Sequence, residues 1–247
     1  MMNETLSQQL KFLHLPGLLS GWEEHLKAAA QGNLSHARLL TRVVEEEYRL
    51  KCDHAREQRL KRARIPQPWA MDTYPFARQP KLSKKKIMAL YDSMDFLKEK
   101  QNVLWMGGTG CGKTGLATSF LVQAIHQGVR GRYVLFADLL HELHRSAADR
   151  SQGNVLRKYL AYDLLLIDEI GYVEAEPVQV GLFFTLMHKR HKNHSTLITT
   201  NLGFSEWSSF LKNPNLTAAL LDRLTESSHV FNMKECVSLR AKMPSDP

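Results

Sequence analysis

The sequence predicts an α/β fold with a parallel sheet, preceded by a small region that is helical throughout. After residue 100, short apolar runs alternate with helical stretches, which is typical of right-handed crossovers between parallel strands. A glycine-rich turn follows the first of these runs and opens a helix, as in phosphate-loop proteins. With 247 residues, the chain has room for one large domain or for one medium domain with an appendage.

The first 65 residues predict three helices. Leu6, Leu10 and Leu13 recur at helical spacing, Pro16 and Gly17 are expected to stop that helix, and a second helix is expected over residues 18–30. Ser35 is the expected N-cap of a third helix over residues 36–64. The apolar face of this third helix is expected to hold Leu39, Leu40, Val43, Val44 and Leu50.

The end of the third helix is strongly basic. Residues 1–100 hold 18 Lys and Arg against 12 Asp and Glu, so most of the formal net charge of +8 lies there. A basic chain favours anionic polymers as partners, and nucleic acid is the commonest. The candidate DNA contacts in this helix are Arg56, Arg59, Lys61, Arg62 and Arg64. Acidic residues near the start of a helix and basic residues near its end also complement the helix dipole. A purely structural role for these basic residues therefore stays open.

Residues 66–80 hold four of the nine prolines, which predicts an extended connector rather than a helix or an inner strand. Its aromatic residues Trp69, Tyr74 and Phe76 are expected to dock on a neighbouring domain.

Beyond the connector, a helix is expected from Lys113 to about Gln127. The predicted strands are 103–106, 133–136, 164–167, 196–200 and 230–233.

The strongest motif is a phosphate loop. The pattern GxxxxGK[ST] would arise by chance about 0.006 times in a chain of this composition. The matching residues are Gly107, Gly108, Thr109, Gly110, Cys111, Gly112, Lys113 and Thr114. Backbone N–H groups of such a loop face phosphates at a helix N-terminus, Lys113 reaches the β- and γ-phosphates, and Thr114 ligates Mg²⁺. The sequence therefore predicts a site for ATP and Mg²⁺.

A phosphate loop of this kind needs a second strand that ends in carboxylates. Residues 164–169, LLLIDE, supply it 55 residues beyond Lys113. Asp168 is the expected Mg²⁺ ligand, and Glu169 is the expected general base for a water molecule. Asn201 ends the next strand, and parallel strands place their carboxyl ends along one edge, so it is expected near the γ-phosphate.

Composition excludes several classes of protein. At 43% hydrophobic and 23% charged residues, the chain is not disordered throughout. It has no apolar run of membrane-spanning length, and its N-terminus lacks the features of a secretory signal. The three cysteines form no CxxC pair, which argues against a disulfide framework and against a zinc site. This usage of cysteine favours the reducing cytoplasm.

The order of the motifs GGTGCGKT, LLLIDE and ITTN resembles the core of an AAA+ ATPase. The chain is most similar to the IstB-type transposition helpers of bacteria, a group related to the DnaC-like helicase loaders. The run EEEYRLKCDHAREQRLKRARIPQP resembles the acidic-then-basic helix and proline connector of that family. The resemblance implies three parts: a helical adaptor for DNA or a partner (1–65), a linker (66–80) and an AAA+ ATPase domain (81–247).

The resemblance also implies roles for individual residues. Lys113 and Thr114 match Walker A, Asp168 and Glu169 match Walker B, and Asn201 matches sensor 1. Arg223 resembles an arginine finger that reaches a neighbouring subunit, although an ordinary helix arginine fits equally well. Arg240 resembles sensor 2, but Cys236 stands where the family usually has glycine. Many relatives carry histidine where this chain has Gly115, and Arg145 and Arg150 are further candidate DNA contacts.

The function expected from this resemblance is ATP-dependent binding and remodelling of duplex DNA in support of a transposase. ATP is expected to assemble the chain into a homo-oligomer, and its hydrolysis to release it. A DnaC-like replicative helicase loader is the main alternative, because it shares the motor. A small-molecule kinase and a DNA-binding module that does not hydrolyse ATP are two further alternatives.

Overall fold

The computed structural model describes residues 2–32, 34–173 and 175–240. Its contacts divide the chain into two compact units, Met1–Gln58 and Arg59–Pro247. The first unit holds α1 (Glu4–Phe12), α2 (Pro16–Gln31) and most of α3 (His36–Ala63). None of the described helices is long and apolar enough to cross a membrane.

The three expected N-terminal helices are present, with two differences from the sequence prediction. The first helix already ends at Phe12, and Pro16 begins α2, where its missing N–H costs nothing. Leu40, Val44 and Leu50 are exposed, although their spacing predicts that they share one apolar face with Leu39 and Val43. The face of α3 that packs on α2 instead includes buried Glu47, whose carboxylate accepts a hydrogen bond from the Leu18 amide at 3.1 Å.

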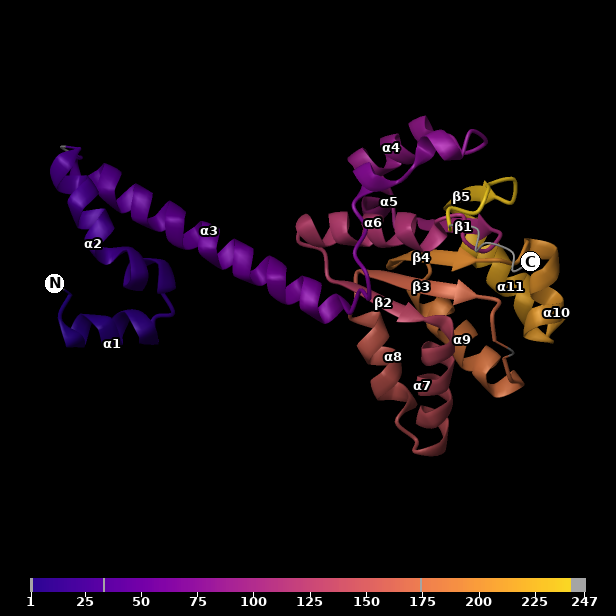
Figure 1. Cartoon of the computed structure of the whole chain (residues 1–247). Coiled ribbons are helices and arrows are strands. Elements are labelled where there is room, and N and C mark those ends of the chain that lie inside the picture. The colour runs from indigo at the N-terminus through magenta and orange to yellow at the C-terminus, as the bar shows by residue number, and fades with distance from the viewer. Residues whose placement is uncertain (1, 33, 174, 241–247) are drawn as a thin grey trace, which may run out of the picture. The chain divides into compact units, whose positions relative to one another are not determined.

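The second unit is a five-stranded parallel sheet covered by helices on both faces (Figure 1). The strand order is β2-β3-β4-β1-β5. The bounds of the strands are β1 (Asn102–Gly107), β2 (Gly131–Leu135), β3 (Leu164–Ile170), β4 (Ser195–Thr200) and β5 (Ser228–Met233). The sequence prediction ran β2 one residue too far, because Phe136 begins the next helix.

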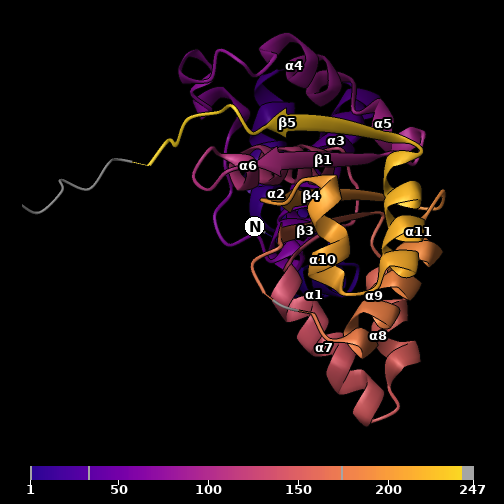
Figure 2. The same ribbon diagram turned by 90° about the vertical axis from the view of Figure 1, so that its right-hand side faces the viewer.

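Side chains alternate between the two faces of the sheet, as the pleat of a strand requires. On β3, Leu164 and Leu166 face one core cluster, and Leu165 and Ile167 face the other. Figure 2 shows the helices of the two faces from the side of β5. The first face is covered by α4 (Lys84–Ser93), α5 (Asp95–Lys98) and α6 (Lys113–His126). The second face is covered by α7 (Phe136–Ala148), α8 (Gln152–Leu160), α9 (Pro177–Arg190), α10 (Trp207–Leu211) and α11 (Pro214–Thr225).

The proline-rich connector is not fully extended. It contains two short 3₁₀ turns, η1 (Met71–Thr73) and η2 (Phe76–Arg78), which the sequence did not predict. Tyr74 is buried, and Phe76 packs against the same core cluster with a ring distance of 4.7 Å to Tyr74. The connector is therefore part of the packed second unit along this stretch.

One buried cation holds the amino ends of the strands together. Arg190, at the end of α9, is 1% exposed and donates hydrogen bonds to the carbonyls of Tyr159, Tyr162 and Ser195. Its Nε also donates to the Thr196 hydroxyl at 3.2 Å. Because buried charges are costly unless they are hydrogen-bonded, this network fixes the end of α8 against the start of β4.

Candidate nucleotide site

The phosphate loop has the backbone that its glycines allow. Gly110 and Gly112 have φ angles of +81° and +92°, which side chains rarely adopt, and Gly112 is the N-cap of α6. A Cβ on Gly107 would lie 2.5 Å from the carbonyl oxygen of Met233 on β5. The loop is thus held between the ends of β1 and β5, with the N-terminus of α6 facing the carboxyl edge of the sheet.

The Lys113 side chain is largely buried at this edge. Its Nζ donates to the carbonyl oxygens of Gly107 at 2.9 Å and Gly108 at 2.8 Å. An ammonium group has three N–H donors, so one donor remains for an anion in the cleft. The loop carbonyls therefore hold the cation where a phosphate group would need it.

The Asp168 carboxylate, 1% exposed, accepts hydrogen bonds from three hydroxyl groups. Thr114 Oγ1 lies 3.0 Å from Oδ1, Tyr133 Oη lies 2.9 Å from Oδ2, and Thr199 Oγ1 also donates to Oδ1. Burial, followed by the charge of Asp168, raises the pKa of Tyr133 well above its ordinary value, so Tyr133 is a hydroxyl donor here. These donors compensate for the burial of the charge and fix its orientation.

Glu169 has an unusual backbone for a strand residue. Its φ is +62°, and the pairing of β3 with β4 shifts register between Ile167 and Ile170. Its amide donates at 2.9 Å to the side-chain hydroxyl of Thr199 on the neighbouring strand β4. This bulge turns the Glu169 side chain out of the sheet and into the cleft, as bulges near functional sites commonly do.

A cleft of about 500 Å³ lies beside the loop and Glu169. The site residues predicted from the sequence that line it are Thr109, Gly110, Gly112, Lys113, Thr114, Glu169 and Arg240. Among the described residues, Gly107, Gly108, Cys111 and Asp168 do not line it. The Cys111 thiol is buried and donates to the Gly108 carbonyl, so it points into the core.

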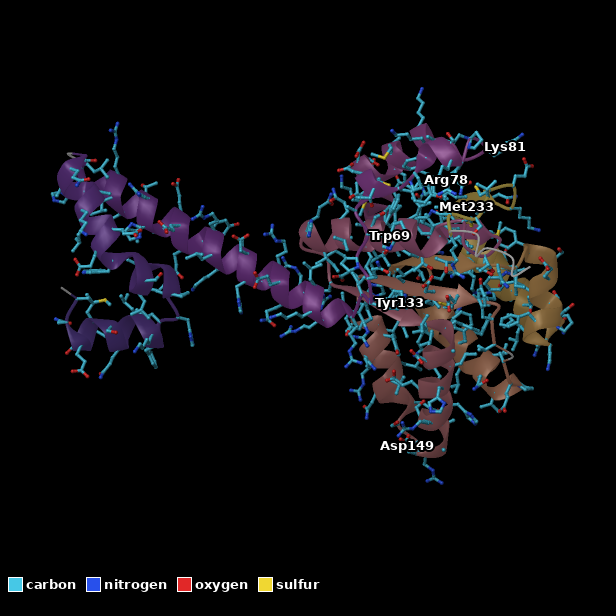
Figure 3. The ribbon with its side chains drawn as sticks, in the orientation of Figure 1. Trp69, Arg78, Lys81, Tyr133, Asp149 and Met233 are labelled. Atoms are coloured by element: carbon cyan, nitrogen blue, oxygen red, sulfur yellow. The ribbon has the colours of Figure 1, made fainter. Side chains whose placement is uncertain are left out.

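Several residues that line the cleft were not predicted as site residues: Gln67, Trp69, Gly115, Tyr172, Thr199 and Leu239. Trp69, labelled in Figure 3, packs so closely on α6 that a Cβ on Gly115 would lie 2.8 Å from its ring. The sequence pointed to this wall of the cleft only through the three aromatic residues of the short connector. It did not indicate which surface those residues cover.

The C-terminal segment crosses directly over the loop. The Leu239 amide donates to the Gly110 carbonyl at 2.8 Å, and a Cβ on Gly110 would lie 2.5 Å from Ser238 Oγ. Gln79 fixes the segment by exchanging two hydrogen bonds with the backbone of Val237, at 2.7 and 2.9 Å. This crossing places Arg240 at the cleft.

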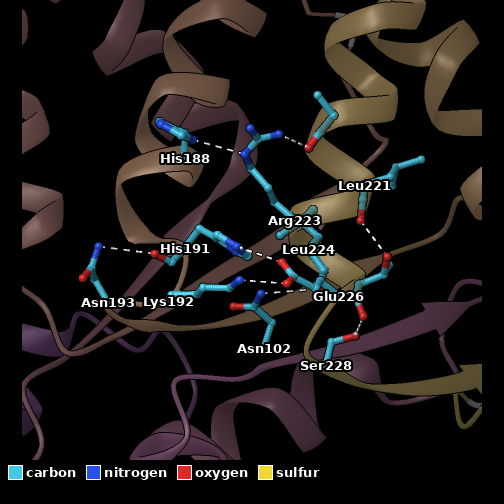
Figure 4. Close-up of polar contacts among 12 residues, drawn as sticks. Asn102, His188, His191, Lys192, Asn193, Leu221, Arg223, Leu224, Glu226 and Ser228 are labelled. Atoms are coloured by element: carbon cyan, nitrogen blue, oxygen red, sulfur yellow. Dashed lines mark hydrogen bonds and ion pairs between the residues drawn. The ribbon is translucent and has the colours of Figure 1, made fainter.

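Asn201 and Arg223 lie outside the lining of the cleft, within the described part of the chain. Asn201 follows β4, and its buried Oδ1 is directed at Gly171 without a hydrogen-bond partner among the described residues. Arg223, on α11, donates from Nε to His188 Nδ1 at 3.1 Å and lies 5.2 Å from the centre of the Phe184 ring. Figure 4 shows it reaching from α11 toward α9.

The candidate DNA contacts are scattered over several elements. Arg56 lies in the first unit and pairs with Asp53 at 2.9 Å. Arg59 and Arg62, in the second unit, line a separate cleft; Arg59 is half-buried, whereas Arg62 is exposed, as are Lys61 and Arg64. Arg145 lines a mixed-charge cleft between α7 and α8, and Arg150 is exposed in the turn that follows α7.

The residues present fit a magnesium ion bound with a nucleotide. Thr114, Asp168 and Glu169 offer hydroxyl and carboxylate oxygens, the ligands that Mg²⁺ prefers, beside a loop that accepts phosphate groups. Thr114 Oγ1 and the Asp168 carboxylate are already in contact. The donor set is therefore appropriate for Mg²⁺.

Solved structures show the same fold at low sequence identity. The DnaI crystal structure has a TM-score of 0.56 at 18% identity, covering 68% of this chain and 92% of that one. The DnaC helicase loader has a TM-score of 0.52 at 23% identity, covering 60% of this chain and 86% of that one. These likenesses confirm the phosphate-loop AAA+ fold.

Sequence comparison identifies the family. A protein of Geobacillus stearothermophilus, named for ATP binding and for insertion sequence IS5376, is 30% identical over 98% of this chain and 96% of its own length. A similarly named protein of insertion sequence IS21 from Pseudomonas aeruginosa is 29% identical over 94% of this chain and 86% of its own length. The family described as IstB-like ATP binding protein matches residues 8–246. The chain therefore belongs to the IstB-like family of insertion-sequence ATP-binding proteins.

Proposed function

We propose that this protein is an ATPase that binds and remodels duplex DNA and assists the transposase of its insertion element. The single observation that supports hydrolysis best is the joint placement of Lys113, Thr114, Asp168 and Glu169 at one edge of the sheet. Family membership and the names of the relatives support the transposition context. The proposed parts are an adaptor (1–65), a connector (66–80) and an ATPase domain (81–247).

In the proposed reaction, the loop amides and Lys113 hold the β- and γ-phosphates. Thr114 and Asp168 would hold a Mg²⁺ ion, which would supply positive charge to offset the charge of the phosphate oxygens. Glu169 accepts a proton from the attacking water, whose oxygen bonds to the γ-phosphorus while the bond to the bridging oxygen breaks. The Thr199 hydroxyl holds the Asp168 carboxylate and the Glu169 amide in position through one hydrogen bond to each.

Three further contacts to the nucleotide or the attacking water are proposed. The base stacks on Trp69, which forms the wall of the cleft contributed by the connector. Arg240 approaches the phosphates from the C-terminal segment, as a sensor-2 residue would. Asn201 orients the γ-phosphate through its amide N–H groups, or the attacking water through its Oδ1, which has no hydrogen-bond partner among the described residues.

Arg223 is proposed to act on the nucleotide of a neighbouring subunit. It lies outside the cleft of its own chain and is held by His188 and by the Ala219 carbonyl at 2.7 Å. The homo-oligomer would then form through the nucleotide, and hydrolysis would disassemble it. The same contacts also fit an ordinary helix arginine, so this role is tested separately below.

The test of the proposed function is the ATPase rate with and without duplex DNA, combined with light scattering. Stimulation by DNA and ATP-dependent assembly are the expected results. Phosphate release without any acceptor distinguishes an ATPase from a small-molecule kinase. A protein that binds ATP and DNA but never turns over would be a DNA-binding module instead.

A helicase loader would use the same ATPase domain, so the test that separates the two functions must identify the partner protein. Capture experiments with the transposase of the same element and with a replicative helicase, each with and without ATP, separate the two. Binding to the transposase alone is expected. Exclusive binding to the helicase would replace the proposed function with helicase loading.

A further inference from the structure

A second cleft, of about 330 Å³, lies at the opposite edge of the sheet from the nucleotide site. It lies beside the amino ends of β2 and β3 and is formed by three segments that are distant in sequence. We call it the amino-edge pocket, and its residues are Arg59, Arg62, Arg130, Gly131, Lys158, Ala161 and Tyr162. All of them belong to the second unit.

Four cationic side chains line the amino-edge pocket, and no described acidic residue does. Two of the cations are paired with acids outside the lining. Arg130 makes a bidentate pair with Asp163, with both distances 3.0 Å, and Lys158 pairs with Glu142 at 2.5 Å. The hydrogen bond from Arg130 lowers the pKa of Asp163, which keeps that pair charged.

The other two cations are available to a ligand. The side chains of Arg59 and Arg62 have no hydrogen bond or ion pair with any residue in the described ranges, and Arg59 Nε is buried without a partner. A buried N–H without a partner is costly, and an anion that accepts its hydrogen bond removes that cost. The pocket therefore lacks an acceptor on the side of α3.

The walls of the pocket are fixed before any ligand binds. Arg132 Nη1, on β2, donates to the Arg62 carbonyl at 2.9 Å and holds the last turn of α3 against the sheet. Arg190 holds the carbonyl of Tyr162 at 2.9 Å on the opposite wall. Arg59 and Arg62 are three residues apart on one helix face, so both guanidinium groups are presented to the same space.

We propose that the amino-edge pocket binds a backbone phosphate of duplex DNA. This inference rests on the proposed DNA binding and adds Arg130 and Lys158, which the sequence had not indicated. Guanidinium groups match phosphate oxygens with paired hydrogen bonds, and Arg is the preferred residue for this contact. Lys61 and Arg64 are exposed beside the pocket, which favours a polymer of phosphates over a single small anion.

The test compares wild type with a double variant, Arg59→Gln with Arg62→Gln. A fluorescent duplex of about 30 base pairs is titrated with each protein, in the presence of ATP, at salt concentrations from about 50 to about 200 mM. The expected result is weaker binding by the variant and a log–log salt slope smaller by about 0.9, the value for one phosphate contact. The matched control is Lys84→Gln with Lys85→Gln on α4, which removes the same charge outside the pocket and should keep the slope.

Three further measurements distinguish the loss of a phosphate contact from misfolding of the variant. Its ATP affinity should equal that of wild type, because the nucleotide site lies at the other edge of the sheet. The variant Arg59→Lys with Arg62→Lys should recover part of the DNA affinity because it restores the charge. Bound DNA should also protect Arg59 and Arg62 of the wild type from phenylglyoxal, read by mass spectrometry.

The outcomes separate this inference from the proposed function. If wild type binds DNA and the Gln variant shows the same slope, or the same loss as the α4 control, the pocket is not a phosphate site. Loss of transposase capture with unchanged DNA binding would assign the pocket to an acidic protein segment instead. If wild type binds no duplex with ATP, DNA binding itself is wrong.

Discussion

The two edges of the same sheet differ in how their charged side chains are paired. At the carboxyl edge, each charge is held by close neighbours: three hydroxyl groups bond Asp168, and two loop carbonyls bond Lys113. At the amino edge, cations from three distant segments converge, and Arg59 and Arg62 remain unpaired within the described structure. The first arrangement suits chemistry on a nucleotide, and the second suits contact with an extended anion.

The largest expected effect comes from replacing Arg223, and it tests whether the nucleotide site of one chain needs an arginine from a neighbouring subunit. Arg223→Ala should bind ATP normally, but its hydrolysis should fall by ~10³–10⁵, the usual value of an arginine supplied to the transferred phosphate. Mixing it with Lys113→Ala should restore some activity, since some interfaces then pair an intact loop with an intact arginine. The measurement is the ATPase rate of oligomers shown to be mixed.

His188→Ala is the matched control for this prediction. It removes the partner of Arg223 Nε while keeping the arginine, so most of the activity should remain. If His188→Ala and Arg223→Ala lose equal activity, and mixing restores none, Arg223 acts within its own subunit as an ordinary helix residue.

The next effect separates binding from chemistry at the carboxyl edge. Glu169→Gln should retain ATP affinity but lose turnover by ~10²–10⁴, because it removes the base and leaves the phosphate loop intact. Lys113→Ala should weaken ATP binding itself. The checks are nucleotide binding by fluorescence and single-turnover hydrolysis, and an unchanged rate in Glu169→Gln would remove this residue from the mechanism.

A smaller effect tests whether hydroxyl groups organise that edge. Thr199→Val keeps the shape of the side chain but removes the bonds to Asp168 and to the Glu169 amide. Activity should fall about 10–100-fold, as for other partners of metal ligands. Amide hydrogen exchange at Glu169 should accelerate, and Thr199→Ser should recover both properties. Normal exchange at Glu169 in the Val variant would contradict the positioning role.

The smallest effect concerns the wall of the cleft. Trp69→Ala should weaken ATP binding about tenfold, because stacking of a base on an aromatic ring is worth about 1–3 kcal/mol. Binding of inorganic tripolyphosphate should not change, since it has no base. An equal loss for both ligands, measured by calorimetry, would mean that Trp69 supports the loop rather than the base.

The two edges also differ in how far the sequence predicts them. The loop and the Asp168–Glu169 pair were predictable because their chemistry requires fixed residue types at fixed spacing in one segment each. Thr199 and Tyr133 were not predicted, since a lone hydroxyl in a strand has no distinguishing pattern. The amino-edge pocket joins Arg59 to Arg130 and Lys158, and no local motif connects them.

The fold, too, is predictable from the sequence only where a local pattern is distinctive. Strands buried on both faces were predicted because continuous apolar runs such as residues 164–167 are distinctive. The end of β2 was missed because Phe136 continues the apolar run into a helix, and periodicity does not separate the two. Helical spacing placed Leu40 and Val44 on a buried face, but burial depends on which neighbours cover the helix.

The close packing of Trp69 on Gly115 has an evolutionary consequence. A side chain at position 115 would occupy the space of the indole ring, so Gly115 cannot gain a side chain while Trp69 keeps its place. Relatives with histidine at the position of Gly115 should therefore carry a smaller residue at the position of Trp69, or a differently routed connector. The two positions, 46 residues apart, are expected to covary, and the glycine that follows the phosphate loop becomes a marker of how the connector meets the nucleotide.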